Sequence, residues 1–560
     1  MSYLDICDLT VSYPFQLKKV LQGINLKINK GEKVLILGPS GGGKSTLALT
    51  LNGIIPRSIE AEMTGSVSVD GYSPIELSFR EISERVGILF QDPETQFCML
   101  SVEDEVLFGL ENLRLHREEM ERRLEKSLEL VGLTNWRKAQ LKELSGGMKQ
   151  KLGLACLLAM DPEVFILDEP TANLDPTSTE EIFNLLIELS YKLNKTLLFI
   201  EHKLDHLLPY LERVIVLGKE GELIADGAPR DIFNHYFSAI IQQGIWVPQI
   251  CKYAKELESQ GMKWSLFPLT MEEWKKGFTG QQLDIQTLQM ETNKQNSNEH
   301  SDRSTILQFK NISFSYQNHP VLKNINFSVS SGDFVALLGP NGAGKSTLSQ
   351  LLIKLLKPEK GEIFLNNDPF SKLKTSELIQ KIGYVFQNPE HQFICDTVEQ
   401  ELAYGLKIRG WRKEEWQPRV DELLEQFYLT EQRQNNPFSL SQGQKRRLSV
   451  ATMLMNDQQL LILDEPTFGQ DYVNTNTIMN LLKELNQSGK TIFMITHDME
   501  LVSEYANKVI LLNESEITYH GDVVPFFKEQ ELLEKASIKV PLSYSLQSLT
   551  RGVKEEAFLC

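Results

Sequence analysis

The stretch that decides the fold is Gly38-Pro39-Ser40-Gly41-Gly42-Gly43-Lys44-Ser45-Thr46. It fits the pattern G-x-x-x-x-G-K-S/T, follows an apolar run over 34–37 that predicts a buried strand, and precedes apolar residues over 47–51 that predict a helix. A strand, a glycine-rich turn and a helix in this order form a phosphate-binding loop, because N–H groups of the turn and of the helix N-terminus attract anions. We therefore expect Lys44 to reach the β- and γ-phosphates of a nucleotide and Ser45 to ligate Mg²⁺.

A second copy of this motif divides the chain into two homologous halves. It reads Gly339-Pro340-Asn341-Gly342-Ala343-Gly344-Lys345-Ser346-Thr347 and also follows an apolar run. Further residues recur in both halves at a nearly constant spacing. The spacing is 301 positions for the lysines, 296 for the glutamines, serines and aspartates, and 295 for the histidines. The pairs are Lys44 and Lys345, Gln91 and Gln387, Ser145 and Ser441, Asp168 and Asp464, and His202 and His497. We predict one domain over 1–227, a helical element and flexible polar linker over 228–305, a second domain over 306–525, and a tail over 526–560.

Composition narrows the class of protein. With 560 residues, a net charge of −17 and 41% hydrophobic residues, the chain is predicted to be a soluble multidomain protein and not a general nucleic-acid binder. Its six cysteines are scattered without a C-x-x-C pair, which fits a reducing cytosol. The sequence shows neither a signal peptide nor an apolar run long enough to span a bilayer, so we expect any work at a membrane to depend on a partner.

Short apolar strands alternate with helical patterns in each half. The runs 164–167 and 460–463 end in Asp-Glu-Pro, and the runs 197–200 and 492–495 end close to a histidine. This alternation predicts a mainly parallel sheet with helices on both faces. Alternating runs at 3–11 and 20–28 predict an antiparallel β-subdomain, and amphipathic patterns over 115–131 and 413–429 predict a helical subdomain. The predicted fold class is therefore α/β, with two tandem P-loop NTPase domains.

A carboxylate pair ends the same predicted strand in both halves. Asp168 and Asp464 stand at the carboxyl edge of the predicted sheet, where an aspartate can hold Mg²⁺ through its water. The next residues, Glu169 and Glu465, are placed to polarise a water for in-line attack on a γ-phosphate.

A serine lies 23 residues before each of these aspartates. It belongs to Leu144-Ser145-Gly146-Gly147 in the first half and to Leu440-Ser441-Gln442-Gly443 in the second. Both serines are predicted to cap a helix N-terminus, which would provide a second anion site in each half.

The chain resembles the nucleotide-binding subunits of ABC transporters. The resemblance rests on five features that occur in the same order in both halves: a phosphate loop, a glutamine, Leu-Ser-x-Gly, Asp-Glu-Pro-Thr and a histidine. The resemblance implies an ATPase that uses ATP and Mg²⁺, with its two lobes paired head to tail within one chain. It places the D-loops at 172–175 and 468–471. It implies that Tyr13 and Tyr316 stack on adenine. It implies that the residues in contact with Mg²⁺ are Ser45, Gln91, Asp168, Ser346, Gln387 and Asp464, and that the catalytic residues are Glu169, Glu465, His202 and His497. It also implies that the γ-phosphate is contacted from the opposite lobe by Ser145, Gly147, Ser441 and Gly443.

A narrower resemblance follows the paired glutamines. The segments Gln91-Asp-Pro-Glu-Thr-Gln-Phe97 and Gln387-Asn-Pro-Glu-His-Gln-Phe393 are similar to the extended glutamine-loop helix of energy-coupling factor transporters. In that family the segment engages a transmembrane scaffold subunit, which works with a substrate-binding membrane subunit. The resemblance implies a peripheral protein on the cytoplasmic face of the cell membrane that drives import of a vitamin, a thiamine precursor or a metal ion.

Two other classes of twin ATPase share this layout. Factors that act on ribosomes carry a strongly basic segment between their lobes, whereas 228–305 here holds eight Lys and Arg against nine Asp and Glu. Tandem ATPases of sugar importers typically have one degraded lobe, while both lobes here keep their Lys, Asp, Glu and His. The lobes still differ, since Met148 replaces the usual Gln of the signature and Gln442 its first Gly, so we expect two unequal sites that both hydrolyse ATP.

Overall fold

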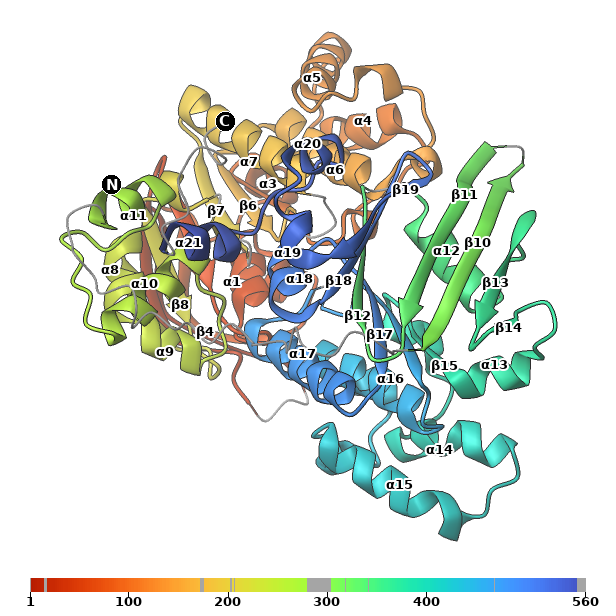
Figure 1. Ribbon diagram of the computed structural model, residues 1–560. Coiled ribbons are helices and arrows are strands. Elements are labelled where there is room, and N and C mark those ends of the chain that lie inside the picture. The colour runs from red at the N-terminus through yellow and green to blue at the C-terminus, as the bar shows by residue number, and fades with distance from the viewer. Residues whose placement is uncertain are drawn as a thin grey trace. The chain divides into compact units, whose positions relative to one another are not determined.

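The computed structural model describes residues 2–14, 18–171, 176–201, 204–205, 207–278, 304–317, 319–340, 342–467 and 469–550. The chain divides into two compact units, residues 1–283 and 284–560 (Figure 1). Some predicted features lie outside the described residues: His202, Asn341, the first D-loop at 172–175, Phe468 of the second, and most of the polar linker.

The first unit is built on a six-stranded sheet. Its strand order is β5-β6-β7-β3-β8-β9, with the first five strands parallel and the last antiparallel. Four of these strands are buried along their whole length, as expected where helices cover both faces of a parallel sheet. The bounds are β3 (Lys33–Leu37), β5 (Val86–Leu89), β6 (Val164–Asp168), β7 (Thr196–Ile200), β8 (Arg213–Leu217) and β9 (Leu223–Gly227).

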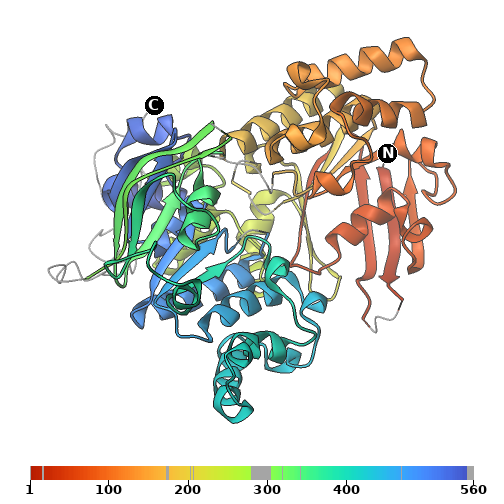
Figure 2. The ribbon, with the colours of Figure 1, turned by 90° about the vertical axis from the view of Figure 1, so that its right-hand side faces the viewer.

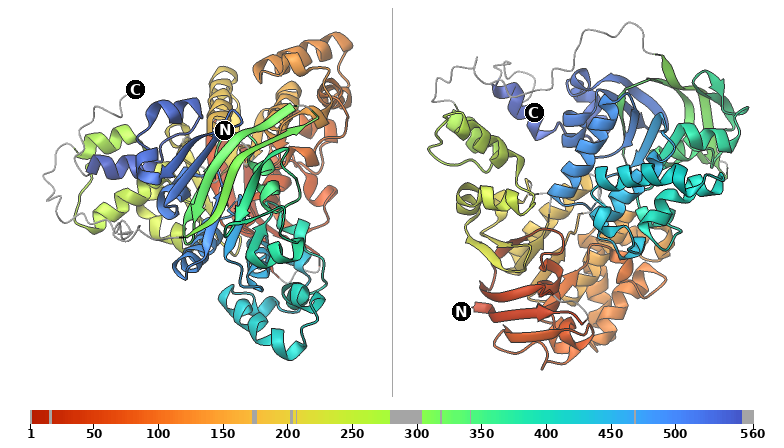
Figure 3. Two further views of the ribbon diagram at one scale, coloured as in Figure 1. Left: turned by 45° about the vertical axis from the view of Figure 1, so that its right-hand side comes forward. Right: turned by 90° about the horizontal axis from the view of Figure 1, so that it is seen from below.

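A second, antiparallel sheet packs on this core. It has the order β2-β1-β4, with bounds β1 (Ser2–Ser12), β2 (Leu21–Asn29) and β4 (Glu62–Val69), and Figure 3 shows it in red. One hydrophobic cluster joins these strands to α1 (Lys44–Leu51) and to one face of the core sheet. The helix that follows the phosphate loop is therefore held between the two sheets.

The remaining helices of the first unit form a helical subdomain and an extension beyond β9. Helices α4, α5 and α6 pack on one another and α6 also packs on β5. The bounds are α2 (Ile54–Arg57), α3 (Phe79–Ser83), η1 (Pro93–Thr95), α4 (Val102–Asn112), α5 (Arg117–Leu130), η2 (Thr134–Trp136), η3 (Leu141–Glu143), α6 (Gly146–Met160), α7 (Pro176–Leu193), η4 (Leu208–Tyr210), α8 (Pro229–His235), α9 (Phe237–Gln242), α10 (Gln249–Ser259) and α11 (Met271–Phe278).

The second unit repeats this architecture. Its core sheet has the order β15-β16-β17-β12-β18-β19 and its antiparallel sheet the order β11-β10-β13-β14. Figure 2 shows α14 and α15 projecting from this unit, away from its antiparallel strands. The strands are β10 (Thr305–Tyr316), β11 (His319–Ser330), β12 (Phe334–Leu338), β13 (Lys360–Leu365), β14 (Asp368–Pro369), β15 (Ile382–Val385), β16 (Leu460–Asp464), β17 (Thr491–Ile495), β18 (Lys508–Asn513) and β19 (Glu516–Asp522).

The helices of the second unit follow the same order. They are α12 (Lys345–Leu352), α13 (Thr375–Lys381), η6 (Pro389–Gln392), α14 (Val398–Ile408), α15 (Lys413–Gln426), η7 (Thr430–Gln432), η8 (Pro437–Ser439), α16 (Gln442–Leu454), α17 (Tyr472–Gln487), α18 (Met499–Tyr505), α19 (Val523–Phe526), α20 (Gln530–Lys535) and α21 (Leu542–Thr550). No helix within the described ranges is long and apolar enough to cross a membrane.

The predicted fold class is confirmed, with a parallel core sheet, an antiparallel subdomain and a helical subdomain in each unit. One local expectation is wrong. The segments after Gln91 and Gln387 form single 3-10 turns, η1 and η6, and not extended helices. The first turn ends early because the Gln96 side chain folds back, accepting from Phe90 N at 3.1 Å and donating to Ile88 O at 3.1 Å.

Candidate nucleotide site

Each phosphate loop connects a buried core strand to a helix, as the sequence predicts. In the first unit the loop leaves β3 and enters α1 through Gly43, whose φ is 86°. A Cβ at this position would lie 2.6 Å from Leu21 Cδ2 and 2.7 Å from Val20 O, so only glycine fits. The second loop leaves β12 through Gly339, where a Cβ would lie 2.1 Å from Leu512 O.

The motif lysine of each loop folds over its own loop. Lys44 Nζ donates to Gly38 O at 2.8 Å and to Pro39 O at 3.0 Å. Lys345 Nζ makes the same two contacts in the second unit, at 2.7 and 3.0 Å to the carbonyls of residues 339 and 340. The ammonium group is therefore held at the anion-binding turn in both units.

In the first unit, four of the predicted side chains form two contacting pairs beside the carboxyl ends of β5 and β6. Ser45 Oγ donates to Asp168 Oδ2 at 2.8 Å, and Gln91 Nε2 donates to Glu169 Oε2 at 2.6 Å. Glu169 has a φ of 48°, and its N–H donates to Ile200 O at 2.8 Å. This unusual backbone conformation directs the glutamate out of the strand, toward the glutamine.

The second unit assembles a comparable group from different contacts. His497 Nδ1 lies 2.8 Å from Glu465 Oε1, which brings the predicted histidine and catalytic glutamate together. Glu465 also has a positive φ, 47°. The Asp464 carboxylate accepts from the Tyr384 hydroxyl at 3.2 Å.

Burial shifts the pKa of two residues of this second group, Asp464 and Tyr384. Burial raises the pKa of the Asp464 carboxyl, and the charge of Glu465 raises that pKa further, while Tyr384 and Lys345 oppose the rise. Burial also raises the pKa of the Tyr384 phenol, so the tyrosine is a neutral hydrogen-bond donor at physiological pH. Asp464 thus sits where a nearby cation would favour its ionised form.

The predicted helix caps are present at both Leu-Ser-x-Gly segments. Ser145 accepts from Met148 N and Ser441 accepts from Gln444 N, each at 3.3 Å. In the second unit Gln444 Oε1 also accepts from Ser441 N at 2.9 Å, closing a reciprocal capping box. Met148 lacks a polar side chain that could do the same, so the two helix starts differ in stability.

The two predicted adenine-stacking tyrosines differ in their contacts. Tyr13 OH lies 3.0 Å from Thr46 Oγ1, on the helix of the first phosphate loop. Tyr316 is 45% exposed, and its ring stands edge-on to Phe314 with the centroids 4.9 Å apart. Tyr13 directly follows β1, and Tyr316 ends β10, where its hydroxyl donates to Gln350 Oε1 at 3.4 Å on the helix after the second phosphate loop. Stacking on adenine stays a prediction.

Sequence reasoning missed the side chains that tie the glutamine loop to the helix after Leu-Ser-x-Gly. Lys149 pairs with Glu94, and Lys445 with Glu390, both at 2.6 Å. In the second unit Arg446 also donates to the carbonyls of Phe386 and Gln387, at 2.7 and 2.6 Å. The sequence does show a lysine shortly after each Leu-Ser-x-Gly segment. The glutamate that pairs with this lysine lies 55 residues away in the sequence, so no local pattern identifies the ion pair.

The residues present fit a nucleotide and Mg²⁺ in both units. Each glycine turn offers backbone N–H groups and a lysine, the donor set that suits a phosphate chain. In the first unit a serine hydroxyl and a carboxylate lie within 2.8 Å of each other, and hard oxygen ligands of this kind are those that Mg²⁺ prefers.

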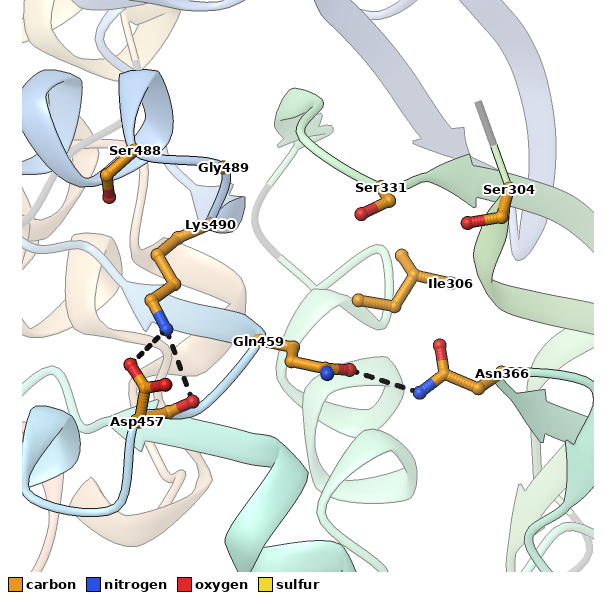
Figure 4. A pocket seen from close by; sticks show the side chains of 9 residues that line it. All are labelled: Ser304, Ile306, Ser331, Asn366, Asp457, Gln459, Ser488, Gly489 and Lys490. Atoms are coloured by element: carbon orange, nitrogen blue, oxygen red, sulfur yellow. Dashed lines mark hydrogen bonds and ion pairs between the residues drawn. The ribbon is translucent and has the colours of Figure 1, made fainter. Parts of the chain in front are cut away.

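A separate pocket of about 480 Å³ in the second unit lies at the other end of the core strands (Figure 4). Gln459 and Lys490 precede β16 and β17, so the pocket is at the amino edge of the sheet, away from the phosphate loop. Lys490 pairs there with Asp457 at 2.5 Å, and Lys195 pairs with Asp161 at 3.1 Å in the first unit. Because this Lys–Asp pair recurs, we interpret it as structural.

Curated relatives match nearly the whole chain. The family model for the ABC transporter domain matches residues 21–172 and 322–468. The chain is 41% identical over 556 residues to "Putative HMP/thiamine import ATP-binding protein YkoD" of Bacillus subtilis, which covers 99% of this chain and 98% of that protein. It is 38% identical over 543 residues to "Putative ABC transporter ATP-binding protein" of Methanosarcina mazei, covering 96% and 91% of the two chains. Among solved structures, cbiO1 of Clostridium perfringens, part of the ABC transporter complex cbiONQ, is 32% identical, covers 44% of this chain and 99% of that chain, and has a TM-score of 0.39.

Proposed function

Because the chain belongs to the ABC transporter family and is an ATP-binding, ATP-hydrolysing member of it, we propose that it is the energy-coupling ATPase of an importer of the energy-coupling factor type. Its cargo would be a vitamin, with a thiamine precursor as the first candidate. The observation that carries the proposal is 41% identity, over nearly the whole chain, to a protein named for HMP/thiamine import. Two phosphate loops with intact lysines and carboxylates support two working sites.

Within each site we assign roles from position and chemistry. Lys44 and Lys345 neutralise the phosphate chain of ATP, and Glu169 and Glu465 hold and polarise the attacking water. Bound Mg²⁺ would supply charge stabilisation to the phosphates, held by the following side chains: Ser45, Gln91 and Asp168 in the first site, and Ser346, Gln387 and Asp464 in the second. The 2.8 Å contact between His497 and Glu465 supports a joint role for them in catalysis.

We further propose that the two units pair head to tail, so that each phosphate loop is completed by the Leu-Ser-x-Gly segment of the other unit. Capped helix N-termini at Ser145 and Ser441 support this, because such N-termini favour a negatively charged γ-phosphate. Binding of ATP would then favour the closed pair, and hydrolysis would allow it to reopen.

The glutamine loops are the proposed attachment points for a transmembrane scaffold subunit, which would act beside a substrate-binding membrane subunit. Large apolar side chains are exposed next to them: Leu100 is 85% exposed in the first unit, and Ile394 is 61% exposed in the second. The ion pairs at Glu94 and Glu390 connect the same loops to the signature helices, which supports transmission of movement between partner and ATP site. The protein would thus lie at the cytoplasmic face of the cell membrane.

Affinity purification and uptake test this proposal together. The tagged chain should co-purify with integral membrane proteins, and cells lacking it should lose uptake of labelled HMP or thiamine. The parent gene should restore uptake, whereas the Glu169→Gln, Glu465→Gln double variant, made at the same level, should not. Co-purification with ribosomes in place of membrane proteins would contradict the proposal, and normal vitamin uptake without the chain would refute the assigned cargo.

A further inference from the structure

The two units differ at a pair of positions directly behind the carboxylate of the ATP site. In the second unit Tyr384, on β15, lies 3.2 Å from Asp464 Oδ2 and 3.2 Å from Ser349 Oγ, on α12. Counting from the shared glutamine and the shared lysine, the first unit has Ile88 and Ala48 at these positions. Both residues belong to its hydrophobic core. A polar pair in one unit therefore replaces an apolar pair in the other.

The hydroxyl groups of this pair form a directed chain. A carboxylate only accepts, so the single O–H of Tyr384 donates to Asp464. Ser349 is then the donor toward the tyrosine oxygen, and it shares its hydrogen with Ser346 O at 2.9 Å. Ser349 is fully buried, so water does not compete for these contacts. The chain runs from the helix of the phosphate loop to the aspartate.

The first unit orients its aspartate by another route. There Asp168 Oδ2 accepts directly from Ser45, the serine of the phosphate loop. That serine is itself a proposed ligand of Mg²⁺, so its hydrogen bond to the aspartate must be exchanged when the ion binds. In the second unit the donor to the aspartate is Tyr384, which is not among the proposed ligands.

We propose that Tyr384 is a positioning residue of the second site, which holds the Asp464 carboxylate in its binding orientation before Mg²⁺–ATP arrives. Ser349 supports it by fixing the tyrosine hydroxyl. This makes the two sites unequal in their demand for Mg²⁺, with the second site preorganised. The inference rests on the proposed role of Asp464 in holding Mg²⁺.

The test measures nucleotide binding, not turnover. In the full chain with Lys44→Ala, binding of a non-hydrolysable ATP analogue reports the second loop. Calorimetric titrations at graded Mg²⁺, and in EDTA, give the Mg²⁺ concentration for half-maximal binding and the metal-free affinity. Tyr384→Phe removes only the hydroxyl, and it should raise that Mg²⁺ concentration about tenfold, the effect of losing one hydrogen bond to a charged group. The metal-free affinity should not change.

Two further variants sharpen the result. Ser349→Ala should shift the Mg²⁺ requirement in the same direction by a smaller factor, about threefold. Tyr428→Phe, at a tyrosine that is 68% exposed in the same unit, is the matched control and should behave like the parent.

Three outcomes would overturn the inference. An unchanged Mg²⁺ requirement in Tyr384→Phe shows that the hydroxyl does not position Asp464. An equal loss of metal-free affinity shows that Tyr384 supports the whole loop and not the aspartate. If the parent itself binds the analogue without any dependence on Mg²⁺, the proposed metal role of Asp464 fails, and the inference about Tyr384 fails with it. Failure of the metal role is thus seen in the parent, whereas failure of the inference alone is seen only in Tyr384→Phe.

Discussion

Replacing Arg446 by methionine should free the glutamine loop of the second unit and lower its stability by about 2 kcal/mol. Arg446 is 2% exposed, and its guanidinium donates to the carbonyls of Phe386 and Gln387, at 2.7 and 2.6 Å. Methionine is apolar and similar in length, so it fills the space without replacing either hydrogen bond.

Two opposing contributions set the size of the effect. Hydrogen bonds from a charged donor contribute about 1.5–3 kcal/mol each, so the pair contributes about 3–6 kcal/mol. Against this, burial lowers the pKa of the Arg446 guanidinium from 12.5 to about 10, which corresponds to roughly 3 kcal/mol of desolvation cost. Its Nε has no hydrogen-bond partner within the described part of the chain, which adds to that cost. The expected net loss is about 2 kcal/mol.

Calorimetry of the full chain measures this loss. A loss of about 2 kcal/mol should lower the transition of the second unit by about 4–8 °C. Amide hydrogen exchange over 386–393 should become at least about tenfold faster, because the loop loses both anchors. The matched control is Gln150→Met, since Gln150 stands at the corresponding position of the first unit, is fully buried, and has no hydrogen-bond partner among the described residues. This control should be neutral or slightly stabilising.

The reasoning would be refuted by either of two results. A drop of more than about 15 °C in Arg446→Met would mean that the buried charge is not offset by desolvation as assumed. Unchanged exchange over 386–393 would mean that the loop does not depend on Arg446.

Three further predictions concern the two sites and the tail. Glu169→Gln and Glu465→Gln should each remove the share of ATP turnover that comes from its own site, because removing a general base slows that site by about a hundredfold or more; full turnover in either variant would contradict two active sites. Adding Ser441→Arg to Glu465→Gln should abolish the remaining steady-state hydrolysis if the units pair head to tail, and persistence of that hydrolysis would exclude the pairing. Burial raises the pKa of Glu500, which accepts from Leu542 N at 2.7 Å at the start of α21. The folded state therefore binds the proton of the Glu500 carboxyl more tightly than the unfolded state does, so the stability of the protein falls as pH rises above about 4.5. Glu500→Gln removes this titration and should raise the urea midpoint at about pH 7 but not at about pH 4.

The sequence alone was sufficient to predict the fold and to locate most residues of the candidate site. The phosphate loops and the Asp-Glu pairs could be predicted because each is a short run of neighbours next to a buried strand, and the parallel sheet brings strand ends to one edge. The helix caps at Ser145 and Ser441 were local in the same sense. The roles of the site residues and the domain boundaries stay predictions.

Only the tertiary structure decided which contacts distinguish the two units. Tyr384 is 80 residues from Asp464, and Arg446 is 60 residues from Phe386, so no local pattern links them. They meet because β15 pairs in register with β16, and because α16 packs against β15 and the turn η6. The same is true of the short 3-10 turn after Gln91, which a side chain of that turn closes by reaching back to the preceding strand. Sequence periodicity predicts which face of an element is buried, whereas the partner of a polar side chain depends on how the elements pack.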